Sequence, residues 1–193
     1  MEKVTDNHQD TNPGSNPADI VVQQALTFQL SGEVYGMDIL DIREIIEYSG
    51  LTPVPMMPDF IEGVINLRGS VVPIVSLAKR FQLPVSPVTK RTSVIVLEVE
   101  DVGEKIEIGL IVDYVNEVLD IDEKEICSAP SFGSKIRAEF IKGMAKIDEK
   151  FLVLLDVESV LSVEELSALK ETSARDFPSD QGKSGGSSDL VSH

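Results

Sequence analysis

Short apolar segments separated by turn-forming residues dominate the chain between about residues 25 and 170. They are rich in β-branched and aromatic side chains, which suit the half-buried surface of a sheet. Ser31 and Gly32 stand between the first two segments and predict a hairpin. The protein is therefore predicted to be mainly β, with strands at residues 25–30, 33–39, 71–75, 93–97, 106–112 and 151–155.

Two segments favour helices instead. Residues 39–46 follow the second predicted strand and suit about two helical turns. In residues 162–170, Ser162 and Glu165 have the spacing of a capping box, and two leucines supply an apolar stripe. We therefore expect a short helix after the second strand and a C-terminal helix.

The body of the chain contains an internal repeat. Residues 60–65 (FIEGVI) recur eighty positions later as residues 140–145 (FIKGMA), and the match continues until 71–75 lie over 151–155. Upstream, residues 35–46 resemble residues 108–119 at an offset of 73. A unit this long is not a solenoid repeat, so we predict two similar β lobes packed together, each a small barrel. We place the lobes at about 25–87 and 88–170, and leave open an exchange of strands between them.

Both ends of the chain are polar. Residues 1–24 and 171–193 contain few large apolar side chains and several Gly, Ser, Asn and Pro residues. Such segments bury too little surface to offset the entropy lost on ordering. We expect two disordered tails, 1–24 and 171–193, on one folded body of residues 25–170.

The chain is strongly acidic, with a formal net charge of −16 over 193 residues. This charge opposes binding to nucleic acid and to anionic membrane surfaces, both of which attract Lys and Arg. No apolar run is long enough to span a bilayer, the N-terminus lacks the features of a signal peptide, and Cys127 is the single cysteine. A cytoplasmic location and protein partners are therefore expected.

Side chains suited to catalysis are scarce in the predicted body. Both histidines, His8 and His193, fall in the tails, which removes the commonest general base from the fold. Cys127 is interpreted as a small packing residue, and the acidic run 120–125 as a solvated turn that leads into a short helix rather than a calcium site. We predict no enzyme activity, no metal and no cofactor. A small metal-dependent hydrolase and a single-strand nucleic-acid binder are less favoured alternatives.

The repeat identifies a candidate binding surface. The turn 66–70 (NLRGS) corresponds to residues 146–150 (KIDEK), so that Asp148 takes the position of Arg68. The fold therefore does not require an arginine there, and arginine is a favoured anchor at protein interfaces. We predict that Glu44 forms an ion pair with Arg68 and orients its guanidinium.

Two apolar features accompany that turn. In residues 42–46 (IREII), we predict that Ile42 is exposed to a partner while Ile45 and Ile46 pack in the core. The loop 51–58 (LTPVPMMP) is stiffened by prolines, which reduce the entropy lost on docking. A loop packed over its own lobe is an equally good interpretation of this segment.

These residues resemble the chemotaxis coupling-protein (CheW) family. Residues 61–77 (IEGVINLRGSVVPIVSL) are similar to its most diagnostic motif, and residues 33–37, 42–46, 129–132 and 140–161 match in order. The resemblance covers about residues 26–169 and implies two five-stranded β-barrels side by side, without catalytic activity. It also implies two partners, the cytoplasmic hairpin tip of a chemoreceptor (a methyl-accepting chemotaxis protein) and the regulatory domain of the histidine kinase CheA.

In the family, the groove between the barrels and the arginine of the NLRG turn are associated with receptor coupling. Carried over to this chain, the resemblance implies as receptor-binding residues Asn66, Arg68 and Gly69, and then Ile42, Glu44 and Val94. It indicates no kinase-binding residues. The long polar tails depart from the compact family body, and the chain lacks receiver, kinase and phosphotransfer segments. A paralogous scaffold in a pilus-motility or surface-sensing pathway is the alternative function.

Overall fold

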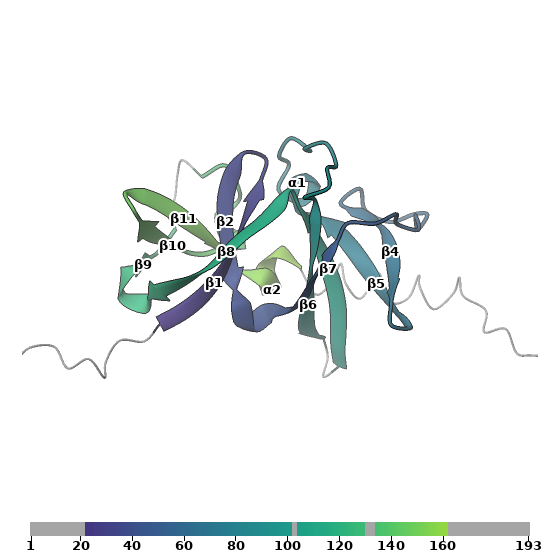
Figure 1. The fold of residues 1–193 in the computed structure, drawn as a ribbon, viewed down its shortest axis with the longest axis horizontal. Coiled ribbons are helices and arrows are strands. Elements are labelled where there is room, and N and C mark those ends of the chain that lie inside the picture. The colour runs from purple at the N-terminus through teal and green to yellow at the C-terminus, as the bar shows by residue number, and fades with distance from the viewer. Residues whose placement is uncertain (1–21, 102–103, 130–133, 162–193) are drawn as a thin grey trace, which may run out of the picture.

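Two β-sheets make up the body of the protein in a computed structural model, which describes residues 22–101, 104–129 and 134–161 (Figure 1). The sheet that we call barrel 1 has the strand order β8 (Tyr114–Asp122), β1 (Val22–Leu30), β2 (Glu33–Asp38), β11 (Lys150–Leu155), β10 (Ile141–Ile147) and β9 (Ile126–Cys127). The sheet that we call barrel 2 has the order β3 (Ile42–Glu47), β6 (Ser93–Asp101), β7 (Glu104–Val112), β5 (Ser70–Ser76) and β4 (Ile61–Leu67). The mainly β, two-barrel architecture is as predicted, except that the two-residue strand β9 gives barrel 1 a sixth strand.

Each barrel combines strands from both halves of the chain. The N-terminal hairpin β1–β2 pairs with β8 and β11, whereas β3 to β5 join the hairpin β6–β7. The two barrels are therefore not the consecutive segments 25–87 and 88–170, because the N-terminal hairpins of the two repeats are exchanged. Figure 1 shows the result, in which the first and last strands of the described chain, β1 and β11, lie together in barrel 1.

The segment 39–46 is not a two-turn helix, and that prediction is wrong. Only Ile39–Asp41 form a 3-10 turn (η2), which Asp38 caps by accepting a hydrogen bond from the backbone N of Leu40. From Ile42 the chain is strand β3, paired with β6. A short isoleucine-rich run fits either element, and strand pairing decides between them. The predicted C-terminal helix at 162–170, the C-terminal tail 171–193 and residues 1–21 of the predicted N-terminal tail lie outside the described residues. Residues 22–24, predicted as the end of that tail, instead begin β1 because they pair with β8.

The remaining short helices cap strands or turns. They are α1 (Leu77–Arg80), η3 (Glu123–Glu125), η4 (Ala138–Phe140) and α2 (Val157–Val160). Turn η3 begins after Asp122, whose carboxylate accepts from the backbone N of Lys124. The acidic run 120–125, predicted to be a solvated turn leading into a short helix, is instead the end of strand β8 followed by this 3-10 turn, and Ile121 within it is buried. No group of His, Cys, Asp and Glu suited to a metal ion occurs in the part of the chain that the structure describes. Nor is any helix there long and apolar enough to cross a membrane.

The two repeats share their irregularities as well as their strands. The pairing register shifts between Ile61 and Gly63 in one copy and between Ile141 and Gly143 in the other. Just before the helices, the backbone N of Ser76 donates to the carbonyl of Phe60, and eighty residues later Asp156 N donates to Phe140 O. β-Bulges are specific features of a fold rather than random defects, so their recurrence at equivalent positions confirms the eighty-residue repeat in three dimensions.

Buried side chains form three clusters. One fills barrel 1 around Ile121 and Leu154, and another fills barrel 2 around Ile74 and Val96. The largest, which we call the central core, joins the barrels and contains residues from the hairpins β1–β2 and β6–β7 and from α1 and α2. Within it the aromatic rings of Phe28, Tyr35, Phe81 and Phe140 follow one another at centroid distances of 5.2–6.3 Å. A shared core of this size makes the two barrels one packed body.

Candidate protein-binding site

The turn between β4 and β5 displays the predicted arginine. Its two central residues, Arg68 and Gly69, have φ values of 52° and 92°, as a two-residue hairpin turn with two left-handed positions requires. The side chain of Asn66 closes the turn by accepting a hydrogen bond from the backbone N of Gly69 at 2.9 Å. Asn66 and Gly69 thus shape the turn, and Arg68 is the side chain that it presents.

Glu44 holds the guanidinium of Arg68, as the sequence predicted. Arg68 Nη1 donates to Glu44 Oε1 and Nη2 donates to Oε2, each at 2.9 Å. The side chain of Arg68 is 72% exposed, whereas that of Glu44 is 19% exposed. Two parallel hydrogen bonds fix the plane of the fork, but an ion pair this accessible adds little to stability. The geometry therefore orients an arginine toward solvent.

Arg43 is a second oriented cation, and the sequence reasoning missed it. Its Nε lies 2.8 Å from Glu107 Oε1 and its Nη1 contacts Glu98 on the adjacent hairpin. A hydrogen bond from Lys105, and then the charges of Lys105 and Arg43, lower the pKa of the Glu98 carboxyl. Arg43 differs from Arg68 because two carboxylates contact it. Its acidic partners on β6 and β7 are visible only once the strand pairing is known.

The isoleucines of β3 are arranged differently from the prediction. Ile42 is partly buried and packs against the central core, and Ile46 packs against the core of barrel 2. Ile45, predicted to be core, is 44% exposed. The apolar side chain that β3 offers to solvent is therefore mainly Ile45.

Val94 does not reach the surface. It is 1% exposed and lies in the core of barrel 2, because β6 is an inner strand between β3 and β7. Its side chain therefore cannot contact a partner in this conformation. The structure thus brings together Asn66, Arg68, Gly69 and Glu44 and places Val94 in the interior.

The proline-rich loop 51–58 is attached to barrel 2 at Thr52. The backbone N and O of Thr52 are paired with those of Val64 at 3.0 and 2.9 Å. Met57 packs against the central core, whereas Met56 is 99% exposed at a φ of 62°. The loop is thus partly packed on its own body and partly displayed.

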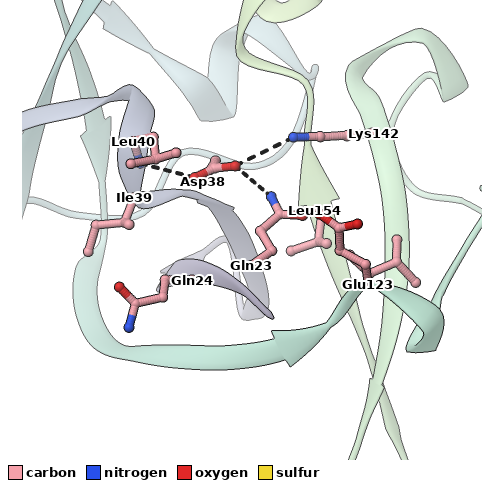
Figure 2. A pocket seen from close by; sticks show the side chains of 9 residues that line it. Gln23, Gln24, Asp38, Ile39, Leu40, Glu123, Lys142 and Leu154 are labelled. Carbon is pink, nitrogen blue, oxygen red and sulfur yellow. Dashed lines mark hydrogen bonds and ion pairs between the residues drawn. The ribbon is translucent and has the colours of Figure 1, made fainter. Parts of the chain in front are cut away.

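A hollow of about 540 Å³ with a mixed polar and apolar lining lies around Asp38 of barrel 1 (Figure 2). Its central group is Asp38, which accepts from Gln23 Nε2 at 2.8 Å and from the backbone N of Leu40, and lies 3.6 Å from Lys142 Nζ. These contacts join β1, β2 and β10. They satisfy the carboxylate without bringing an acid–base pair or a nucleophile to the hollow.

Cys127 lies on the surface, so the prediction of a half-buried packing residue is wrong. It belongs to the short outer strand β9, and its thiol donates to the carbonyl of Met144 at 3.2 Å.

Comparisons with known proteins agree with this architecture. The model of the CheW-like domain family matches residues 24–165. A chemotaxis protein CheW of Klebsiella aerogenes is 39% identical over 76% of this chain and 86% of its own, and one of Bacillus subtilis is 34% identical over 74% and 88%. The crystal structure of the scaffolding protein TtCheW from Thermoanaerobacter tengcongensis superposes with a TM-score of 0.67 at 36% identity, over 75% of this chain and 96% of that one. The chain therefore belongs to the CheW family of non-enzymatic chemotaxis scaffold proteins.

Proposed function

We propose that this protein couples the cytoplasmic tip of a chemoreceptor to the histidine kinase CheA, and that the Arg68 turn is part of its receptor-binding surface. The observation that carries the proposal is the bidentate pair of Arg68 and Glu44. The equivalent turn of the repeat folds with Asp148 in place of Arg68, so folding does not account for the arginine.

The chemistry of the site is that of recognition. A planar guanidinium fixed at the tip of a stiff hairpin offers its remaining N–H donors to carboxylate or carbonyl oxygens of a partner. Because Glu44 already restricts the side chain, less conformational entropy is lost on docking. Ile45 follows Glu44 on β3, so its exposed side chain points to the opposite face of the strand and is not part of this fork.

A scaffold needs two faces on one rigid body. The central core packs the barrels together, which supports a fixed geometry between a receptor bound at one face and a kinase bound at another. Holding both partners raises their effective concentration for each other without any chemical step. Membership of the CheW family supports a location in the cytoplasm at receptor arrays.

The test is capture of a purified receptor cytoplasmic fragment by the full chain, with and without CheA. Arg68→Glu should reduce receptor capture at least about tenfold, since it replaces a charge-assisted donor by a repelling acid. Its thermal midpoint should stay close to that of the wild type, because the pair is exposed.

The matched control is Lys146→Glu, which makes the same change of charge in the equivalent turn of barrel 1. This variant should capture receptor like the wild type. Equal capture by Arg68→Glu and the wild type, or equal loss in both variants, would refute the assignment of Arg68.

A further inference from the structure

Barrel 1 has a second groove, away from the Arg68 turn. It has a volume of about 940 Å³, and its floor includes Leu119, Ile147 and Leu152. Two lining side chains are large, apolar and exposed: Val34 by 42% and Phe151 by 59%. Neighbouring exposed apolar groups around a concave surface are typical of an interaction site.

The same groove is acidic. Glu117 of β8 and Asp148 of the β10–β11 turn both line it, and Lys150 is its one basic lining residue. Within the described ranges, neither the Glu117 nor the Asp148 carboxylate makes a hydrogen bond or an ion pair. Two acids beside an apolar floor attract a cation that also brings apolar surface.

The repeat shows what these two acids replace. Glu117 corresponds to Glu44, and Asp148 corresponds to Arg68. The backbone is alike in the two turns, with φ values of 45° at Asp148 and 52° at Arg68. In barrel 2 an internal guanidinium therefore joins the turn to the strand, whereas in barrel 1 both positions carry carboxylates and no internal cation joins them.

We propose that this groove binds a segment of a partner protein that inserts an arginine between Glu117 and Asp148. A planar guanidinium can donate to two carboxylates at once, as a lysine ammonium cannot do in one plane. Apolar side chains next to that arginine would cover Val34 and Phe151. The site is thus the counterpart of the Arg68–Glu44 pair, with the arginine supplied by another molecule.

The experiment uses the full-length protein, labelled with ¹⁵N, and a capped peptide of sequence Gly-Ser-Leu-Phe-Arg-Gly-Leu-Ser-Gly. Titration should shift the backbone amides of the groove, including those of Leu119, Ile147 and Leu152. A peptide with glutamine in place of arginine should bind at least about tenfold more weakly, because the charge-assisted hydrogen bonds are lost. Equal binding of both peptides, or shifts confined to other regions, would overturn the proposal.

Asp148→Arg tests the site from the protein's side. The new arginine should form with Glu117 the ion pair that Arg68 forms with Glu44 in barrel 2, and so fill the groove. Binding of the arginine peptide should then be at least about tenfold weaker, while the fold stays intact. The matched control is Glu149→Arg, which makes the same charge change at the next residue and should retain binding. Glu117→Gln, which preserves side-chain size, should weaken binding as well. Equal effects of Asp148→Arg and Glu149→Arg would mean that only net charge matters, and would sink the proposal.

The two binding proposals fail separately. Arg68→Glu should leave binding of the arginine peptide unchanged, because Arg68 lies in barrel 2. If the wild type instead self-associates in sedimentation, and both Arg68→Glu and Asp148→Arg abolish that association, then the occupant is a second copy and the partner proposal is wrong.

Discussion

Gly63→Ala should destabilise the protein by about 3–5 kcal/mol. A Cβ at this position would lie 2.4 Å from the carbonyl oxygen of Thr52, at a φ of 150° that side-chain-bearing residues rarely adopt. The unusual backbone conformation costs about 1–3 kcal/mol. Relief of the clash would separate Thr52 from Val64 and lose their two backbone hydrogen bonds, at about 1 kcal/mol each. The loop that carries Met56 would then be released from barrel 2.

The repeat supplies the control for this prediction. Gly143 occupies the equivalent bulge without a left-handed φ, and a Cβ there would lie 2.6 Å from Ile126 Cγ2 and 3.2 Å from the carbonyl oxygen of Cys127, both on the two-residue edge strand β9. Gly143→Ala should therefore cost less, about 1–2 kcal/mol. Thermal unfolding followed by circular dichroism should place the midpoint of Gly63→Ala roughly 10 °C below the wild type. Midpoints of the two variants that agree within about 2 °C would refute the reasoning, since a change of 1 kcal/mol already moves the midpoint by that amount.

Three further substitutions test the cores and the charge balance. Phe140→Ala, which removes a ring 1% exposed in the central core, should lower the free energy of unfolding in guanidinium by about 3–5 kcal/mol. Val94→Ala should cost about 2 kcal/mol in the same assay while receptor capture per folded molecule stays unchanged, because Val94 is internal. Burial, followed by the charge of Asp38, raises the pKa of Asp41, so the folded state disfavours its charged form and loses stability as pH rises past the ordinary aspartate range. Asp41→Asn should therefore melt higher than the wild type at neutral pH, and this difference should vanish near about pH 3, where both states hold the proton.

The internal repeat predicted the architecture, and the candidate site was predicted from Arg68, whose equivalent in the second copy is Asp148. The offset of eighty residues correctly identifies β4–β5 and β10–β11 as equivalent hairpins. Comparison of Arg68 with Asp148 then predicts the ion pair between Arg68 and Glu44. These inferences succeeded because local patterns fix strands and turns. The repeat says nothing about which hairpin joins which sheet, because exchanged and unexchanged barrels bury the same alternating residues. The pairing of β1 with β8 shows that the hairpins are exchanged.

Side-chain exposure was the weakest part of the prediction. The predictions that Ile42 is exposed and Ile45 is core are wrong, because β3 alternates its side chains between two faces and the sequence does not show which face meets the core. The residue type of Cys127 predicts a half-buried packing position, yet it is exposed on a two-residue outer strand. In each case the outcome depended on a neighbour distant in sequence.

The exchanged hairpins have a consequence for how the chain can be divided. A cut in the segment between α1 and β6 would give two pieces, each containing strands of both barrels. Neither piece holds a complete sheet, so each should stay unfolded alone and fold only with the other. The protein is thus suited to complementation by co-expressed fragments, and a single proteolytic nick there would leave the scaffold intact.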